Sequence, residues 1–112
     1  MSQVQHLEEQ LIDGDERIKR GNAVQRLIRN PDFKEVIVDY FSTVDCARYA
    51  RESVDPALTE EQRASALAFA QAAGYLKQWL TYQIRFGETA QAQRQELVDA
   101  IEEARAEDVG AA

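Results

Sequence analysis

The sequence predicts an all-α fold, with an antiparallel helical hairpin, an additional N-terminal helix and a long C-terminal helix. Three observations support this prediction. The 112 residues include only five glycines and two prolines, and they are rich in helix formers such as Ala, Glu, Gln, Arg and Leu. Apolar residues recur at steps of three and four, which is the period of a helix. Both prolines stand where a helical pattern stops. At this length we expect one domain covering residues 1–112.

The N-terminal segment, about residues 2–29, is expected to form a helix. Its seam of apolar residues and glycines consists of Val4, Leu7, Leu11, Gly14, Ile18, Gly21 and Ile28. A glycine weakens an isolated helix by about 1 kcal/mol relative to alanine. On a seam, however, it also allows close approach of another backbone. The alternative is two short helices, broken at Asp13–Asp15 and at Gly21–Asn22.

Residues Asn30-Pro31-Asp32 predict a sharp boundary between this helix and the next. Pro31 has no amide hydrogen and disfavours helical geometry at Asn30, so the first helix is expected to end near Arg29. Proline suits the first turn of a new helix, with Asn30 as its N-cap and Asp32 favourable to the helix dipole. The second helix is therefore expected over about residues 31–52.

The second helix is expected to bury one apolar stripe. The stripe consists of Phe33, Val36, Ile37, Tyr40, Phe41, Val44 and Ala47. The helix should end before the turn at Asp55-Pro56. Thr59 with Gln62 three residues later is a capping-box signature. It predicts a third helix that begins there and runs over about residues 60–108.

The first half of the third helix carries two apolar rows. The aromatic row consists of Tyr75, Trp79, Tyr82 and Phe86, and the second row of Phe69, Ala73, Leu76, Leu80 and Ile84. At about 100° per residue the two rows cover roughly 200° of the helix surface, about twice the width that one neighbouring helix covers. We therefore predict that the aromatic row is a protein-interaction surface, because Trp and Tyr are enriched in interface hot spots. The alternative is that these rings form ordinary intramolecular core.

Charge is distributed unevenly along the chain. The net charge of −7 opposes binding to a phosphate backbone. The basic cluster consists of Arg17, Lys19, Arg20, Arg26 and Arg29, which scatter around the N-terminal helix instead of forming one stripe. The C-terminal part, residues 88–112, holds seven acids and two bases, with Leu97, Ile101 and Ala104 continuing a heptad-like seam. Its acids, around Glu102 and Glu103, are expected to form a solvated helix face.

Residues with catalytic or metal-binding chemistry are scarce. His6 and Cys46 are the strongest candidates for a nucleophile, base or metal ligand, and each stands alone in the sequence. Zinc sites need clusters of Cys and His, and carboxylate metal sites in helical bundles need Glu-x-x-His motifs, which this sequence lacks. We therefore predict a protein that is not an enzyme, with no cofactor, no metal and no small-molecule substrate. The single cysteine and the absence of a signal-peptide core or long apolar run predict a cytoplasmic location and no membrane partner.

Three stretches carry a further pattern: RGNAVQRLIRNPDFKEVIVDYF, CARYARESVDPALTEEQ and AAGYLKQWLTYQIRFGETAQ. The pattern comprises an Asn-Pro-Asp-Phe corner at Asn30–Phe33, the pair Tyr40-Phe41, the turn Asp55-Pro56 and a long final helix from Thr59. Over roughly residues 20 to 90 the chain thereby resembles small helical proteins encoded among the head and packaging genes of tailed bacteriophages. Asp39 departs from the pattern, which has a small residue there. The resemblance implies a phage structural or assembly setting and no catalytic residues.

These features together predict a structural or assembly protein that acts through coiled-coil-like helix–helix association. We expect it to be a homo-oligomer or part of a larger protein assembly, in the host cytoplasm or the virion. One alternative is an acidic inhibitor that mimics nucleic acid and blocks a host protein. Another is a small DNA-packaging subunit that touches DNA through Arg17–Arg29.

Overall fold

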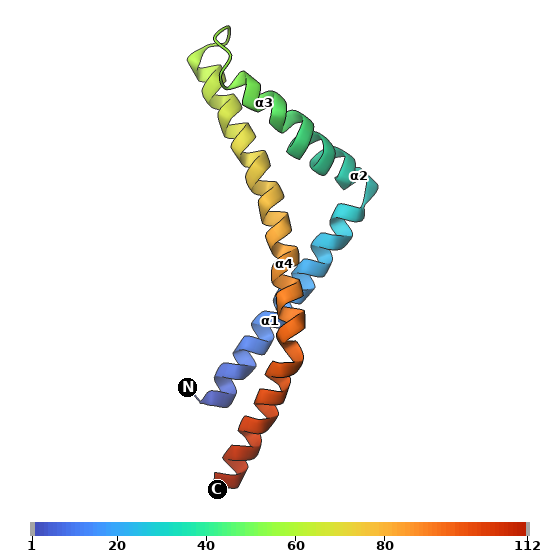
Figure 1. Cartoon of the computed structure of the whole chain (residues 1–112), viewed down its shortest axis with the longest axis vertical. Coiled ribbons are helices and arrows are strands. Elements are labelled where there is room, and N and C mark those ends of the chain that lie inside the picture. The colour runs from blue at the N-terminus through green and yellow to red at the C-terminus, as the bar shows by residue number, and fades with distance from the viewer. Residues whose placement is uncertain (1, 112) are drawn as a thin grey trace. The chain divides into compact units, whose positions relative to one another are not determined.

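The computed structural model describes residues 2–111, and within this range the regular secondary structure is entirely helical. The elements are α1 (Gln3–Arg29), α2 (Pro31–Phe33), η1 (Lys34–Asp45), α3 (Cys46–Glu52) and α4 (Glu60–Ala111). Because α2, η1 and α3 follow one another without a break, they form the second of three long helices (Figure 1). The predicted all-α fold is confirmed, and so is the uninterrupted N-terminal helix, since α1 runs through both of its possible breaks.

The chain divides into two compact units. The first unit comprises the chain up to Ala23 together with the chain from Gln83 onward, and the second unit is Val24–Tyr82. Helices α1 and α4 therefore each contribute to both units.

In the first unit, α1 packs antiparallel to the last part of α4 (Figure 1). An ion pair joins Asp15 to Arg94 at 2.9 Å, and another joins Glu8 to Arg105. Partner numbers thus rise along α4 as they fall along α1, which defines the antiparallel direction. The buried apolar residues of α4 here include Ile101, which belongs to the predicted heptad-like seam.

Two glycines mark a close crossing of the helices within the first unit. A Cβ atom added to Gly21 would lie 2.9 Å from the carbonyl oxygen of Gln83 and 3.2 Å from the Cα of Gly87. A Cβ added to Gly87 would lie 3.0 Å from the carbonyl oxygen of Arg17. These neighbours are backbone atoms, so no side-chain rotation could relieve the contacts. Glycine at both positions therefore allows this approach, as the N-terminal seam predicted for Gly21.

The second unit contains the helical hairpin. Its arms are η1 with α3 on one side of the turn and the first part of α4 on the other (Figure 1). The Tyr49 ring stacks on Phe69 with 5.1 Å between ring centroids. The Cys46 thiol donates a hydrogen bond to the carbonyl oxygen of Ala70 at 3.5 Å. Buried residues of α4 in this unit are Ala66, Ala73 and Leu80.

Both predicted helix starts have the expected caps. Asn30 Oδ1 accepts hydrogen bonds from the backbone N–H groups of Asp32, at 3.0 Å, and Phe33, at 3.1 Å. At the start of α4, the Thr59 N–H donates to Gln62 Oε1 at 2.9 Å, and the Gln62 N–H donates to Thr59 Oγ1 at 3.1 Å. The latter pair is a complete capping box, which satisfies two backbone donors that the helix itself leaves without partners.

The middle of the second helix differs from the prediction, because η1 is a π-helix of 12 residues. In a π-helix the backbone N–H bonds to a carbonyl five residues earlier, so each turn is wider than in an α-helix. Two side-chain contacts follow the same spacing. Lys34 Nζ pairs with Asp39 at 3.0 Å, and Thr43 Oγ1 donates to the carbonyl oxygen of Val38 at 3.0 Å.

The wider turns change which side chains are buried. The predicted apolar stripe is wrong for Val36, Tyr40, Val44 and Ala47, which are all exposed. Ser42, outside that stripe, is buried instead. An α-helical stripe assumes about 100° per residue. Bonding to the fifth residue lowers this angle, so residues chosen at α-helical steps drift away from one face.

Candidate protein-interaction surface

The aromatic row remains accessible in the single chain. The exposed fraction is 68% for Tyr75, 50% for Trp79, 40% for Tyr82 and 47% for Phe86. The first three residues belong to the second unit, and Phe86 follows on α4 in the first unit. In soluble proteins, large aromatic side chains are on average well buried, so this exposure is the main candidate for a functional feature.

The row lies on the opposite side of α4 from the buried residues of the second unit. Ala73 is completely buried, and Leu80 is 7% exposed. At about 100° per residue, these two positions lie roughly 140° around the helix from the aromatic row. Of the two apolar rows predicted on α4, the second row therefore supplies these buried positions. The aromatic row faces away from the hairpin core and stays accessible to solvent or to another surface.

Two of the four rings, those of Tyr82 and Phe86, already make contacts with neighbouring side chains. Gln78 Nε2 donates a hydrogen bond to the Tyr82 hydroxyl oxygen at 2.6 Å. The Arg17 guanidinium lies 5.9 Å from the centroid of the Phe86 ring, within the range of a cation–π contact. Exposure is greatest at Tyr75 and Trp79. We therefore place the centre of the candidate surface at Trp79, which offers the largest ring.

The described core is small in volume. No large side chain among the described residues is fully buried, and the buried apolar residues are Val24, Ala66, Ala73, Leu80, Ile101 and Ala104. Exposed large apolar side chains occur in both units, and in the second unit they include Val36, Tyr40 and Val44 on η1. Small chains with modest cores often gain burial from a partner. The exposed apolar surface therefore indicates association with other protein chains.

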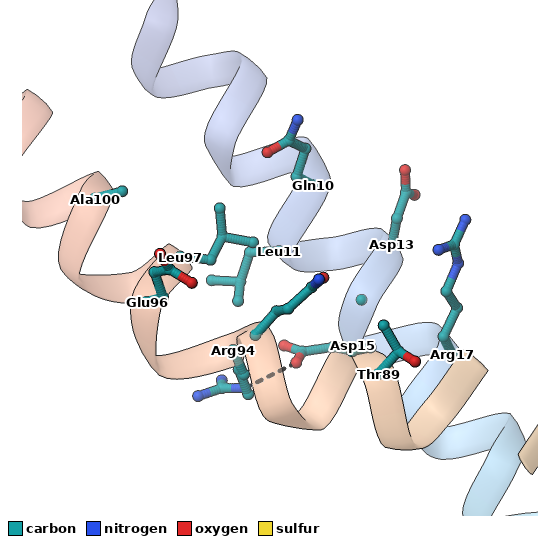
Figure 2. Close-up of a pocket in the computed structure, with 13 residues that line it drawn as sticks. Gln10, Leu11, Asp13, Asp15, Arg17, Thr89, Arg94, Glu96, Leu97 and Ala100 are labelled. Atoms are coloured by element: carbon teal, nitrogen blue, oxygen red, sulfur yellow. Dashed lines mark hydrogen bonds and ion pairs between the residues drawn. The ribbon is translucent and has the colours of Figure 1, made fainter. Parts of the chain in front are cut away.

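The first unit contains a groove between α1 and α4. It measures about 460 Å³ and is lined by residues of α1 and α4. Leu11 and Leu97 lie between the two helices, and Asp15 binds Arg94 beside them (Figure 2). This hydrogen bond is the main cause that raises the pKa of Arg94 above its ordinary value. Five charged side chains and no aromatic ring line the groove, unlike the mainly apolar and aromatic lining of ligand pockets.

The contacts of His6 and Cys46 are local packing and hydrogen bonds, with no catalytic or metal-binding partner beside either residue in the described structure. The exposed His6 ring is 3.1 Å from the side-chain nitrogen of Gln10, one turn later on the same helix. Cys46 is half-buried, and its thiol bonds to a backbone carbonyl. Among the described residues, no group of three or more His, Cys, Asp or Glu side chains is placed to hold a metal ion. No helix in this range is both long and apolar enough to cross a membrane.

The two charged regions lie on helices and are open to solvent. All five side chains of the basic cluster are exposed, with Arg17, Lys19 and Arg20 in the first unit and the other two in the second. Helix α4 continues to Ala111, so the C-terminal acids project from a helix. Four of them follow steps of three and four along one side and are exposed: Glu96, Asp99, Glu103 and Glu107.

Comparisons with protein-family models, curated proteins and solved structures gave no match to this chain. The resemblance to phage head and packaging proteins therefore stays a prediction. The exposed row on α4 is the feature from which a function can be argued.

Proposed function

We propose that the protein is a non-enzymatic structural or assembly component, which builds a larger protein assembly through its aromatic row. The observation that carries this proposal is the position of Trp79. Its indole is 50% exposed, on the side of α4 away from the buried residues of the hairpin. Trp and Tyr dominate interface hot spots because they bury a large area at a small cost in side-chain entropy.

The area of the row sets the strength of association that it can provide. An aromatic side chain buries about 150–250 Å². At the observed exposures, the four rings thus offer about 400 Å² per chain. At about 25 cal/mol per Å², this area corresponds to a gross gain of about 10 kcal/mol. Association costs about 4–15 kcal/mol in lost freedom of motion, so the rings need support from neighbouring residues of α4.

The setting that we propose is the head or packaging machinery of a tailed bacteriophage. The support for it is the pattern at Asn30–Phe33, Tyr40-Phe41 and Asp55-Pro56, followed by the long helix α4. An assembly component needs no catalytic residues, which agrees with the structural surroundings of His6 and Cys46.

The test is the mass of the purified protein as a function of concentration, by light scattering or sedimentation. We expect an oligomer, and Trp79→Ala should lower its mass while circular dichroism still shows a helical protein. Ile12→Ala is the matched control, because Ile12 is also exposed, at 62%, but lies on α1. If the wild-type protein stays monomeric, or if Trp79→Ala unfolds the helices without changing the mass, the proposed function is wrong.

One observation favours a second candidate function, inhibition of a host nucleic-acid-binding protein by mimicry. The exposed acids at 96, 99, 103 and 107 stand on a continuous helix, with about 1.5 Å of rise per residue between them. This candidate predicts that the protein captures nucleic-acid-binding proteins and that duplex DNA competes for them. Changing Glu103 and Glu107 to Gln should then abolish capture, and capture that survives these changes would exclude mimicry by this row.

A further inference from the structure

We infer that the partner of the aromatic row is a second copy of this chain, with the two α4 helices packed antiparallel about a two-fold axis near residues 80 and 81. This inference rests on the proposed function, because it names the partner of the same surface. It also fixes the direction and register of the contact, which the proposed function leaves open.

The spacing of the row has the symmetry that such a pair needs. The residues Tyr75, Trp79, Tyr82 and Phe86 stand at steps of four, three and four, so the row reads the same in both directions. In an antiparallel pair, Trp79 of each copy lies opposite Tyr82 of the other, and Tyr75 opposite Phe86. A two-fold interface of this kind makes every contact twice from a single patch. All four aromatic positions then face an aromatic position.

The charges along α4 favour the antiparallel direction. No acid occurs between Gln62 and Gly87. Of the two bases within the span of the row, Lys77 lies on the opposite side of α4 at about 100° per residue, and Arg85 flanks the row. In a parallel pair, the acidic stretches after residue 95 would lie side by side. Like charges placed opposite one another are unfavourable. In the antiparallel pair, Arg85 approaches the uncharged Gln78 region, and the two acidic stretches lie at opposite ends.

The area agrees with an interface between two copies. A stable interface buries about 800 Å² per partner, and the four rings supply about half of this. The rest must come from exposed residues that flank the row on α4. Those available are Ala68, Gln71, Ala72, Gln78 and Thr89. They are small or uncharged, so they can be covered by a second helix with no buried charge.

Cysteine cross-linking tests the register. Cys46 is first changed to Ser, with Cys46→Ala as a second background, and circular dichroism checks that each is helical. Gln71→Cys and Thr89→Cys are then introduced together. Both positions are exposed and uncharged, and they are nearly equidistant from the proposed axis. Within one chain they are about 27 Å apart along the helix, so they cannot form a disulfide with each other.

Under mild oxidation, we expect the double variant to form a covalent dimer, with residue 71 linked to residue 89 in the digested peptides. Each single variant should stay largely uncross-linked. Cross-linking of the single variants would show a parallel pair and overturn the inference. So would an absence of cross-links in a protein whose mass still falls on Trp79→Ala, and in that case the proposed function stands. A wild-type protein that is monomeric at every concentration would overturn both.

Discussion

The close crossing of α1 and α4 in the first unit predicts that glycine-to-alanine substitutions will have opposite effects at different positions. At Gly21 an added Cβ meets the backbone of Gln83 and Gly87 at 2.9 Å and 3.2 Å. At Gly14, on the same face of α1, the nearest atom is the Cβ of Ala90 at 3.8 Å, which is an ordinary contact. The same methyl group should therefore destabilise the protein at Gly21 and stabilise it at Gly14.

The magnitude follows from two opposing effects. Replacing a helical glycine with alanine stabilises the helix by about 0.5–1 kcal/mol. Forcing an extra carbon into a closely packed contact costs about 1–3 kcal/mol. At Gly21 the contacted atoms are backbone, so the helices themselves must separate, and we expect a net loss of about 1–2 kcal/mol. Gly14→Ala has only the favourable effect, and we expect a gain of about 0.5–1 kcal/mol.

Thermal and urea denaturation followed by circular dichroism would measure this difference. A change of 1 kcal/mol corresponds to a shift of about 4–8 °C in Tm for a domain of 60–100 residues. Gly87→Ala should behave like Gly21→Ala, because its Cβ would meet the carbonyl oxygen of Arg17 at 3.0 Å. Gly74→Ala is a second control, since nothing lies within 4 Å of its added Cβ. If Gly21→Ala raised Tm as much as Gly14→Ala does, the helices would not cross as closely as described.

Three further predictions concern the second unit and the assembled protein. Thr59→Ala removes the capping box with Gln62, and urea denaturation should show a loss of about 1 kcal/mol; an unchanged midpoint would contradict the role of this cap. Ser42→Ala removes a buried hydroxyl that has no hydrogen-bond partner in the described structure, so thermal denaturation should show a gain of about 1 kcal/mol. The control is Ser65→Ala, the same change at an exposed position on α4, and a loss at Ser42 would reveal a partner for its hydroxyl. Finally, Tm should rise with protein concentration, because association stabilises the folded chain, and a Tm independent of concentration would argue against self-association.

Features set by neighbouring residues could be predicted from the sequence. The corner at Asn30-Pro31 and the capping box at Thr59 each depend on side chains within three positions of one another, and the structure contains both. The uninterrupted α1 was also predictable, because its seam keeps one helical period across Gly14 and Gly21. By contrast, the tight crossing at Gly21 pairs it with residues more than 60 positions away. The sequence alone indicates that such a glycine can be approached, but not by which helix.

The π-helix was not predictable for a different reason. The same backbone N–H and C=O groups can bond four residues apart, as in an α-helix, or five residues apart, as in a π-helix. A periodicity read at about 100° per residue assumes the α-helical pattern. The burial of Ser42 and the exposure of Tyr40 follow from this shift. The aromatic row on α4 was easier to find, since α4 keeps ordinary helical geometry, and the width of its two apolar rows already exceeded what one neighbouring helix could cover.

The distribution of side-chain sizes on α4 connects its packing to its proposed role. Ala66 and Ala73 are buried in the hairpin, whereas Trp79 and Tyr75 are at least half exposed. Burying alanine contributes little hydrophobic free energy, while a large ring contributes about 1.5–3 kcal/mol when it is fully covered. Two of the three buried residues of α4 in the hairpin are alanines, which contribute little, while its largest rings remain about half exposed. Covering these rings would supply apolar burial that the single chain lacks. We therefore expect the free energy of unfolding to rise with association, so that a substitution that weakens the contact lowers both the oligomer mass and the Tm.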